Sequence, residues 1–538
     1  MRRGLFLVLP VSLAAFCSCR PAEAARGQSA AEPAATQPVS TQPAATQPAT
    51  LSPAQRARRV ADLHVRSVEL AEAGKWAECI PVLEQILQLD PGNETAWYNM
   101  ACVHARLGRA DRAVEHLNAA LRHGYSDFRH MERDPDLASL RPLPGYRQLL
   151  ARNAEIQRDR AEKIRDALRK RFGEGYIVRI DHANKLVFAT NIDRQTLSEL
   201  TDHLTAYAEA MWNDLFGHRF EQYVTIVIPS GGEGILASRP VAGYYRHDER
   251  MLVAGQIGMV LNHEFTHALH DADQDGLGQR HPIWISEGLA TLFESSRVQD
   301  GRVEPEPNPR LNLLKRFVAR KQAIPWKRLF SYDRRQFMRR ALVGYPQAGY
   351  VLMYLRQKGL LKKWYDAYTA GFEEDPTGAK AVEKVFGKPL EQVEADWLAW
   401  VQRQPAPPLR IEPDQAYIGI AVSGQTDGLR IRRVVPGSGA EDAGLKAGDV
   451  IVQIDGRRIV EATALMQLVS GHEVGEKLEV RFRRDGRYET RTVTLKPMPA
   501  DVARPQPTTA PRRPRTTTRP APASRPAPPA TAPGKKAA

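Results

Sequence analysis

The segment that most constrains this 538-residue chain is 263–267 (HEFTH), which lies inside an apolar stretch from Ile257 to Leu269. On an α-helix, residues four apart project from the same face, so His263 and His267 can reach one metal ion, with Glu264 beside them. Buried polar side chains need partners, because each costs roughly 2–7 kcal/mol without one in an apolar setting. A metal ion supplies such a partner, and we therefore predict a metal-binding helix.

A third ligand follows twenty residues later, in the segment 287–290 (EGLA), which lies within a second apolar stretch. Zinc sites that keep an open position commonly use three protein ligands and leave the fourth position to water. The two imidazoles alone are one ligand short, and Glu287 completes the set. We predict one Zn²⁺ ion held by His263, His267 and Glu287. The alternative reading of the first motif by itself is a solvated, charged helix face.

With both motifs in place, residues 176–404 resemble a peptidase-MA-like gluzincin zinc metallopeptidase, whose pattern is HExxH followed by ExxA. The segment 345–352 (YPQAGYVL) is similar to the tyrosine-bearing helix start of the aminopeptidase-N-type members. The resemblance implies an α+β zincin-like domain. It also implies that Glu264 is the catalytic general base and that Tyr345 steadies the oxyanion, with Tyr350 as a competing candidate.

A 34-residue period begins near Val60 and matches Gly74 with Gly108 and Leu83 with Leu117. This period resembles the tetratricopeptide repeat (TPR), so we predict α-helical TPR-like repeats over 56–150. Two repeats leave an apolar face open, and we expect the stretch 128–150 to cap it with a further helix pair. Such an array either binds a segment of a protein partner or serves as a packing scaffold. Residues 151–175 are predicted to be a helical connector.

The segment 411–498 closely resembles a mostly-β PDZ domain of the kind found with bacterial proteases, on the strength of 417–420 (YIGI) and 443–451 (AGLKAGDVI). In such domains a glycine-bearing loop offers backbone N–H groups to the terminal carboxylate of a peptide, and the peptide adds as a strand. The loop is expected to comprise Tyr417, Ile418, Gly419 and Ile420, and the pocket for the last side chain to be lined by Ala462, Leu465 and Met466.

The amino-terminal segment has a charged start and then a short apolar run, the layout of a secretory signal. We predict a signal peptide over 1–24 and a disordered linker over 25–55. Cys17 or Cys19 would allow lipid anchoring as an alternative. The chain is therefore expected to be exported to the periplasm or cell envelope of a bacterium.

The charge distribution argues against a nucleic-acid partner. The chain carries 76 basic and 62 acidic residues, a net charge of +14, but 501–538 alone hold eight basic residues and one acidic residue, which is +7. We predict that 499–538 form a disordered, basic Pro/Ala-rich tail. No specific nucleic-acid binding is expected, and the tail leaves association with a membrane surface open.

Taken together, the resemblances imply an exported zinc metallopeptidase that hydrolyses peptide bonds, with the TPR and PDZ modules recruiting protein or peptide substrates and partners. Aminopeptidases of the resembled group carry a Gly-x-Met-Glu-Asn motif where 243–246 (GYYR) stands here, which favours an endopeptidase. Two alternatives remain open. One is an aminopeptidase of the PDZ-bearing gluzincin type, and the other is a non-catalytic TPR/PDZ scaffold.

Overall fold

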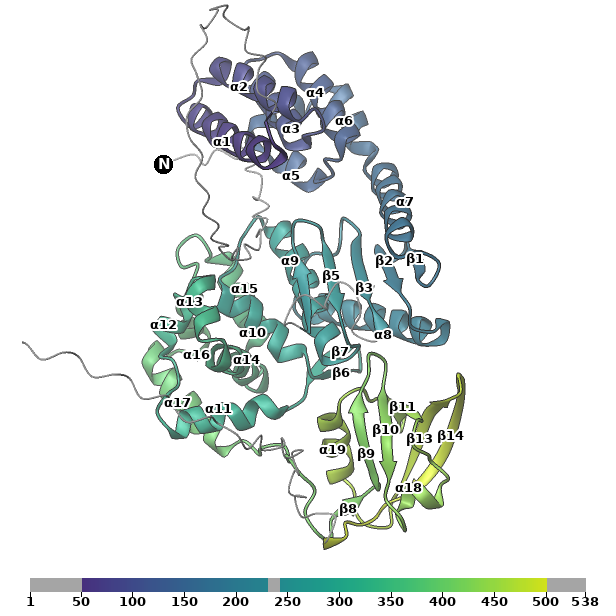
Figure 1. Ribbon diagram of the computed structural model, residues 1–538. Helices are drawn as coiled ribbons and strands as arrows, with labels where there is room; N and C mark the ends of the chain where they lie inside the picture. Colours follow the sequence, from purple (N-terminus) through teal and green to yellow (C-terminus); the bar gives the residue numbers. More distant parts are fainter. Residues whose placement is uncertain (1–50, 231–241, 501–538) are drawn as a thin grey trace, which may run out of the picture.

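A computed structural model describes residues 51–230 and 242–500, which form three bodies stacked along the molecule (Figure 1). A helical array stands at one end, an α+β domain in the middle and a small β-rich domain at the other end. The predicted signal peptide, most of the predicted linker and nearly all of the predicted basic tail lie outside the described residues. Among the described helices, none has both the length and the apolar character needed to cross a bilayer.

The helical array begins with two helical hairpins whose turns repeat at the predicted spacing. Each turn contains a glycine in the left-handed region, Gly74 at φ 71° and Gly108 at φ 72°, where a residue with a side chain would be strained. The 34-residue period therefore corresponds to one helix–turn–helix unit. The four helices are α1 (Pro53–Glu72), α2 (Trp76–Leu89), α3 (Glu94–Arg106) and α4 (Ala110–His123).

The cap of this array differs from the predicted helix pair. Three short helices occupy the stretch, because prolines stand at the first turns of the second and third and so divide it. Asp134 fixes the first junction: its carboxylate accepts from the Asp136 backbone N–H at 2.8 Å and from the Tyr98 hydroxyl at 2.6 Å. The three are α5 (Phe128–Arg133), the 3₁₀ helix η1 (Pro135–Leu140) and α6 (Pro144–Ala151).

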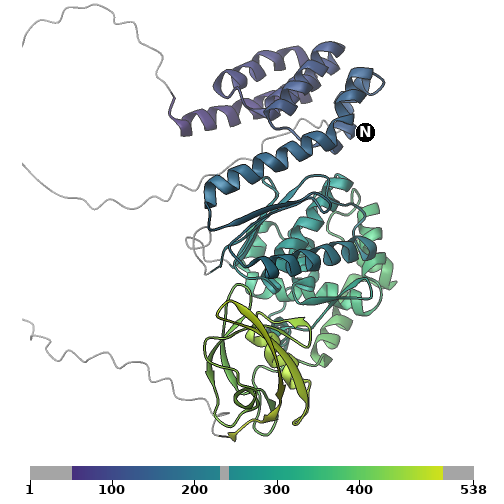
Figure 2. The same cartoon turned by 90° about the vertical axis from the view of Figure 1, so that its right-hand side faces the viewer.

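The predicted connector is a long helix, α7 (Asn153–Phe172), that also covers one face of the central sheet. Ala161 and Leu168 of α7 share a buried cluster with Val187, Val227 and Val253 of the sheet. Figure 2 shows the helix lying along the strands. The connector therefore contributes to the core of the middle domain.

The central sheet has the strand order β1-β2-β3-β5-β4, with β2, β3 and β5 parallel and the two outer strands antiparallel. Its other face packs against helices α8 (Arg194–Asp214) and α9 (Met259–Leu277) in the largest buried cluster of the described residues. Strand β4 lies at one edge of the sheet. The strands are β1 (Ile177–Asp181), β2 (Leu186–Thr190), β3 (Val224–Ile228), β4 (Gly243–Arg246) and β5 (Met251–Ala254).

The second half of the middle domain is almost entirely helical and packs around α10 and α14. The closest packing is marked by Gly288 and Gly349, where a Cβ would come within 3.0 Å of Leu352 and 2.6 Å of Thr291. The elements are α10 (Ile283–Phe293), the hairpin β6 (Ser296–Gln299) and β7 (Arg302–Pro305), α11 (Pro309–Ala319), α12 (Trp326–Phe330), α13 (Arg334–Arg339), α14 (Ala341–Gln357), α15 (Leu361–Ala370), α16 (Ala379–Phe386) and α17 (Leu390–Arg403).

The β-rich domain is built on a sheet in which β9 is an edge strand and helix α19 lies beside it (Figure 1). Its core is separate from that of the middle domain and contains Ile418, Leu465 and Phe482. The elements are β8 (Ala416–Tyr417), β9 (Ile420–Gly424), β10 (Leu429–Val434), α18 (Gly439–Asp442), β11 (Val450–Ile454), β12 (Arg457–Arg458), α19 (Ala462–Ser470), β13 (Lys477–Arg484), β14 (Arg487–Thr494) and β15 (Lys496–Pro497).

The β-rich domain is docked on the middle domain through both apolar and charged contacts. Val460 is 4% exposed and belongs to the buried cluster of the middle domain. Arg483 bridges Asp193 of the middle domain, at 2.8 Å, and Asp427 of its own domain, at 2.7 Å. Glu199 of α8 accepts from Arg481 at 2.9 Å. These contacts fix how the two domains face each other.

The tightest point of this interface is Gly258, directly before α9. Its φ is 109°, and a Cβ there would come within 2.4 Å of Val460 Cγ2. Gly278, at the other end of α9, also has a positive φ (69°), but no atom would lie within 4 Å of its Cβ. Of these two glycines, only Gly258 therefore combines an unusual backbone conformation with a steric conflict.

We expect Gly258→Ala to lower the free energy of unfolding of the middle domain more than Gly278→Ala does. Gly278 has the left-handed conformation (φ 69°, ψ 28°), which costs a residue with a side chain about 1–2 kcal/mol, whereas Gly258 (φ 109°, ψ −134°) lies near a region that essentially only glycine adopts. Only Gly258→Ala adds an overpacking cost of about 1–3 kcal/mol at the domain interface. Urea unfolding midpoints of the full chain measure the difference, and equal midpoints for the two variants would contradict this packing.

Candidate metal centre and peptide groove

Helix α9 carries the first motif, and its own sequence explains why the motif faces inward. Leu261, Phe265 and Leu269 are completely buried and anchor the helix in the core of the middle domain. His263 and His267 project from a neighbouring face, with side chains 13% and 12% exposed. Their rings lie edge to face, with centroids 4.9 Å apart. The i, i+4 spacing therefore brings the two imidazoles together.

Glu287 of α10 completes a compact set of three donor groups. Its Oε2 lies 3.4 Å from His263 Nε2 and 3.3 Å from His267 Nε2, and the donor atoms of all three residues lie within 4.8 Å of one another. Ligands at about 2.0–2.1 Å from a tetrahedral zinc are about 3.3 Å apart. Glu287 Oε2 is buried and faces both imidazole nitrogens. The donor set therefore fits one zinc ion, while the presence of the ion stays a prediction.

The electrostatics of the cluster also suit a cation. Burial by itself would raise the pKa of Glu287, but the facing His267 and His263 rings lower it below the usual range for a glutamate. Burial would lower the pKa of His263, but hydrogen bonds to Glu287 and Glu294 raise it to about 10. Without a metal, a proton is therefore held between these groups. Metal binding would release that proton, so affinity for the metal rises with pH.

A carboxylate that the motifs did not identify orients the first histidine. His263 Nδ1 lies 3.1 Å from Glu294 Oε2, and Glu294 is itself bound by Arg310 Nη2 at 2.9 Å and Asn308 Nδ2 at 3.2 Å. Ligand histidines are typically held by such a carboxylate on the second ring nitrogen. In the sequence, the available signal was the position of Glu294 seven residues after Glu287, two helical turns along α10.

Glu264 and Tyr345 lie beside the donor set. Glu264 is 8% exposed, and its burial raises the pKa of its carboxyl group. The ring of Tyr345 lies 6.1 Å from that of His263, and burial together with the nearby Glu287 raises the pKa of its phenol. The competing Tyr350 is directed elsewhere, because its hydroxyl accepts from the Asn308 backbone N–H at 3.3 Å. The geometry thus brings together the predicted metal ligands, Glu264 and Tyr345.

A further buried carboxylate of α9 lies beyond the donor set. Asp271 is 5% exposed and binds two residues of the β4–β5 hairpin. The Tyr245 hydroxyl donates to it at 2.9 Å, and His247 Nδ1 lies at 2.8 Å. Asp271 therefore holds the edge strand against α9. Asp271 is four residues after His267 and therefore lies on the same buried face of α9, one turn further along the helix.

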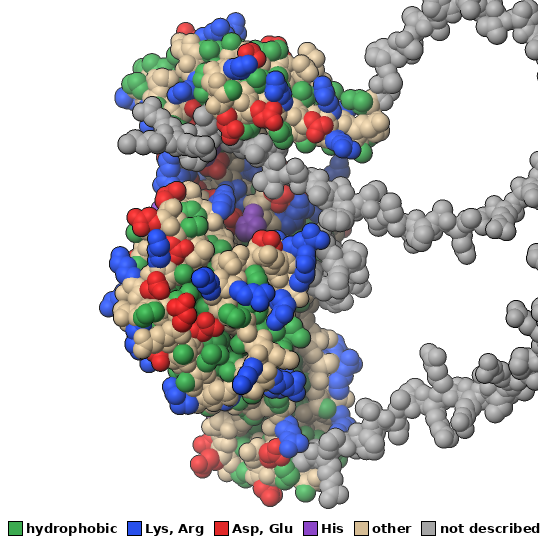
Figure 3. All heavy atoms as spheres, turned by 90° about the vertical axis from the view of Figure 1, so that its left-hand side faces the viewer, with side chains coloured by type: hydrophobic (Ala, Val, Ile, Leu, Met, Phe, Trp, Pro, Cys, Tyr) green, Lys and Arg blue, Asp and Glu red, His purple; other side chains and the backbone are tan. Residues whose placement is uncertain are grey.

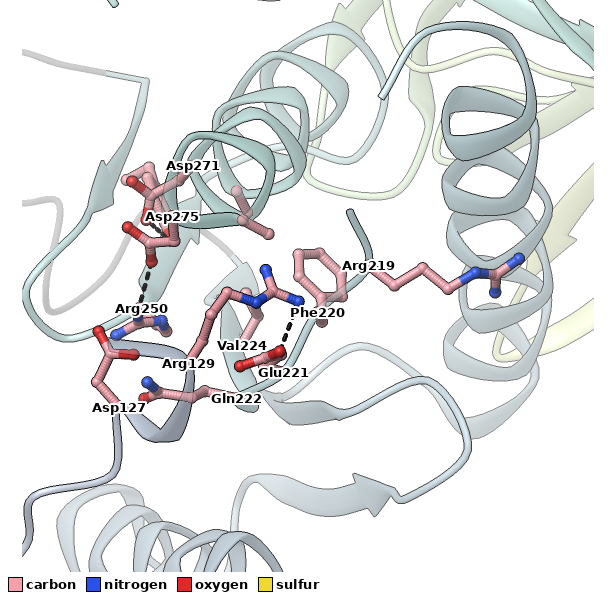
Figure 4. Close-up of a pocket in the computed structure, with 13 residues that line it drawn as sticks. Asp127, Arg129, Arg219, Phe220, Glu221, Gln222, Val224, Arg250, Asp271 and Asp275 are labelled. Carbon is pink, nitrogen blue, oxygen red and sulfur yellow. Dashed lines mark hydrogen bonds and ion pairs between the residues drawn. The ribbon is translucent and has the colours of Figure 1, made fainter. Parts of the chain in front are cut away.

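The same face of α9 ends in a small polar pocket at the junction with the helical array (Figure 4). Charges of opposite sign pair across it: Arg250 with Asp275 at 2.7 Å, and Arg129 of α5 with Glu221 at 2.5 Å. The pairing leaves no unpaired charge among these four groups. We interpret this pocket as part of the interface between the helical array and the middle domain.

In the β-rich domain, the loop predicted to bind a carboxylate adopts a suitable conformation. Gly419 has φ 94°, and its carbonyl and that of Ile418 accept from the N–H groups of Val435 and Ala440 at 2.8 and 3.0 Å. Within the described residues, the N–H groups of Ile418 and Gly419 donate no backbone hydrogen bond. The flanking Tyr417 and Ile420 are 9% and 8% exposed and anchor the loop. The amide groups are thus available at one end of the β9–α19 groove.

Comparisons with known proteins match the two flanking parts of the chain. A family model described as a PDZ domain matches residues 416–495, and one described as a tetratricopeptide repeat matches 70–131. The chain therefore contains a PDZ domain and TPR repeats, as the sequence predicts. Neither match covers the middle domain.

The relatives found share only short regions with this chain. One is described as a probable periplasmic serine endoprotease, DegP-like, from Marinomonas sp. (strain MWYL1), 39% identical over 77 residues, 14% of this chain and 16% of that protein. A chloroplastic protein of Arabidopsis thaliana is 33% identical over 99 residues, 18% of this chain and 29% of that protein. Among solved structures, the HtrA3 PDZ domain bound to a phage-derived ligand is 21% identical, covers 17% of this chain and 94% of that chain, and has a TM-score of 0.15.

These findings correct the family prediction. Named relatives include serine proteases of the DegP and HtrA kinds, which contradicts the identification as a gluzincin, as a metalloprotease and as a zinc metallopeptidase enzyme. The zincin-like assignment of the middle domain is likewise not supported by the matched families. The physical reason is that the two motifs determine a local donor geometry, and a donor geometry does not by itself determine a reaction.

The chain spans only 16% to 29% of the lengths of the first relatives, so the activity of those proteins does not carry over to it. Serine proteases of this chemistry depend on a serine hydroxyl hydrogen-bonded to a histidine ring. In residues 51–230 and 242–500, the ring partners of histidines are carboxylate, amide, phenol, imidazole and carbonyl groups, with no serine among them.

We expect Glu294→Gln to weaken zinc binding by about tenfold to a hundredfold, because a neutral amide holds His263 less firmly than a carboxylate does. A matched control is Glu209→Gln. This substitution removes an exposed ion pair with Arg219, and neither residue is one of the donor groups or their partners. Competition with a fluorescent zinc chelator measures both affinities. Equal affinities for the two variants would contradict an orienting role for Glu294.

Proposed function

We propose that this chain is an exported scaffold that captures the carboxyl-terminal ends of other proteins in its PDZ domain and holds a second protein segment on its TPR array. The observation that carries the proposal is the pair of N–H groups of Ile418 and Gly419 at the end of the β9–α19 groove. Two adjacent amide donors suit a carboxylate, and the edge strand β9 suits a peptide added as a strand.

The position of the protein is inferred from two observations. The amino-terminal sequence has the layout of a secretory signal, and one named relative is periplasmic. We propose export to the periplasm or cell envelope, with lipid anchoring as the alternative that Cys17 and Cys19 allow. On the face drawn in Figure 3, acidic and basic side chains intermingle over the helical array and the middle domain. This distribution favours protein partners over a nucleic acid.

We also propose that the middle domain holds one Zn²⁺ ion through His263, His267 and Glu287. Three protein ligands leave a coordination position for water or another oxygen donor, at which zinc acts as a Lewis acid. In a scaffold, the ion would have a structural role, because its ligands come from two different helices. His263 and His267 on α9 and Glu287 on α10 would be tied together through the ion, and the buried Glu287 Oε2 would become one of its ligands.

We expect the full chain to bind decapeptides that end in a free carboxylate and an apolar residue about tenfold to a hundredfold more tightly than the same peptides with an amidated end. A charge-assisted hydrogen bond contributes about 1.5–3 kcal/mol. Fluorescence anisotropy with labelled peptides measures the difference. Met466→Glu, in the predicted pocket on α19, should weaken binding, and Ser470→Glu at the exposed end of α19 is the control. Binding that is unaffected by amidation would contradict carboxylate capture.

We expect wild-type protein to bind one zinc ion per chain and Glu287→Ala to bind zinc much more weakly, by atomic absorption after dialysis. We also expect the zinc-loaded protein to leave unfolded protein and peptide libraries uncut, by mass spectrometry. Zinc-dependent cleavage by wild type that Glu264→Gln abolishes would overturn the scaffold proposal.

A further inference from the structure

The PDZ groove of this chain ends against the middle domain. The groove lies between the edge strand β9 and helix α19, and the free amide groups of Ile418 and Gly419 mark the end that takes a carboxylate. A peptide added antiparallel to β9 runs from that end toward Gly424, the last residue of the strand. Peptide residues further from the carboxyl end therefore contact the residues that lie next to Gly424.

Gln256 of the middle domain stands at that position. Its side-chain Nε2 donates to the Val460 carbonyl at 2.6 Å and lies 3.4 Å from the Gln425 carbonyl. A Cβ on Gly424 would lie 3.4 Å from the same nitrogen. Val460 precedes α19 and Gln425 follows β9, so this one side chain reaches both walls of the groove.

The neighbouring backbone holds Gln256 in place. The Ile257 N–H donates to the Thr426 carbonyl at 2.8 Å, and the Met259 N–H donates to the Glu461 carboxylate at 3.1 Å. The Gly255 N–H donates to the Ala242 carbonyl at 2.9 Å, next to the edge strand β4. The segment 255–259 is thus bound on one side to the PDZ domain and on the other to the central sheet.

Beyond Gln256 the two domains enclose a cleft with a polar lining. Its charged groups are Asp193, Asp427 and Arg483, which pairs with both carboxylates, and the rest of its polar side chains are uncharged. The side chains of this cleft therefore offer hydrogen bonds to a polar peptide segment. The lining residues from the middle domain are Asn191, Ile192, Asp193, Ser230, Gly255 and Gln256, and those from the PDZ domain are Gly424, Gln425, Thr426, Asp427 and Arg483.

We propose that the PDZ groove and the middle domain form one composite peptide site, in which Gln256 contacts the ligand about five residues upstream of its carboxyl end and helps to select it. The occupant is the carboxyl-terminal segment of another protein, apolar at its last residue and polar at about the fifth and sixth residues from the end. The estimate of five follows from the five residues of β9, since paired strands advance residue by residue. This inference rests on the proposed capture of carboxyl-terminal peptides.

The test uses the full chain and a series of labelled peptides with one carboxyl-terminal sequence and lengths of four, six and eight residues. We expect the six- and eight-residue peptides to bind about threefold to tenfold more tightly than the tetrapeptide, because they add hydrogen bonds at Gln256 and the cleft. Gln256→Ala should remove this gain and keep the tetrapeptide affinity. The control is Gln402→Ala, in α17, whose side chain contacts the Lys315 carbonyl away from the PDZ domain.

A photo-cross-linking arm on wild-type protein avoids any effect of the substitution on folding. With benzoylphenylalanine at the fifth position from the carboxyl end, we expect cross-links in the segment 255–257, and with the probe at the second position only in PDZ segments. Tetrapeptide binding with no gain on lengthening, or fifth-position cross-links confined to the PDZ domain, would overturn the composite site alone. Absence of binding at every length would overturn the proposed function and this inference together.

Discussion

The structure depends on how helix α9 begins. Gly258 leaves no room for a side chain, so Val460 of the PDZ domain enters the core of the middle domain directly before the helix. The first N–H group of α9 is capped by Glu461, a carboxylate from the PDZ domain, whose pKa burial raises to about 7. One turn later the same helix presents His263. The peptide-binding domain and the helix with the proposed metal ligands are therefore built against each other.

Much of the candidate site could be predicted because it follows from local periodicity. The i, i+4 spacing alone places His263 and His267 on one face of α9, and Glu287 lies on the next apolar helix. Glu294 was missed, because the seven-residue spacing from Glu287 does not show that the carboxylate meets His263, which depends on the angle at which α10 crosses α9. The role of Asp271 also depends on tertiary contacts, since Tyr245 and His247, which bind it, lie on the β4–β5 hairpin.

The same distinction applies to the fold. The 34-residue repeat could be predicted from its period. Helix α7 was predicted only as a connector, because its packing on the sheet through Ala161 and Leu168 is a tertiary contact. The docking of the PDZ domain on the middle domain could not be predicted from the sequence, because nothing in the sequence distinguishes Val460 from other apolar residues that precede a helix. The resemblance to zinc peptidases extended a correct donor geometry to an activity that the named relatives contradict.

The most direct test of the account is hydrogen–deuterium exchange on the full chain with and without a saturating octapeptide that has a free carboxylate. The account predicts new protection in three segments together: 417–424 and 462–469 of the PDZ domain, and 255–257 of the middle domain. Protection confined to the two PDZ segments would contradict a site formed by both domains, and protection in none of the three would contradict carboxyl-terminal capture itself.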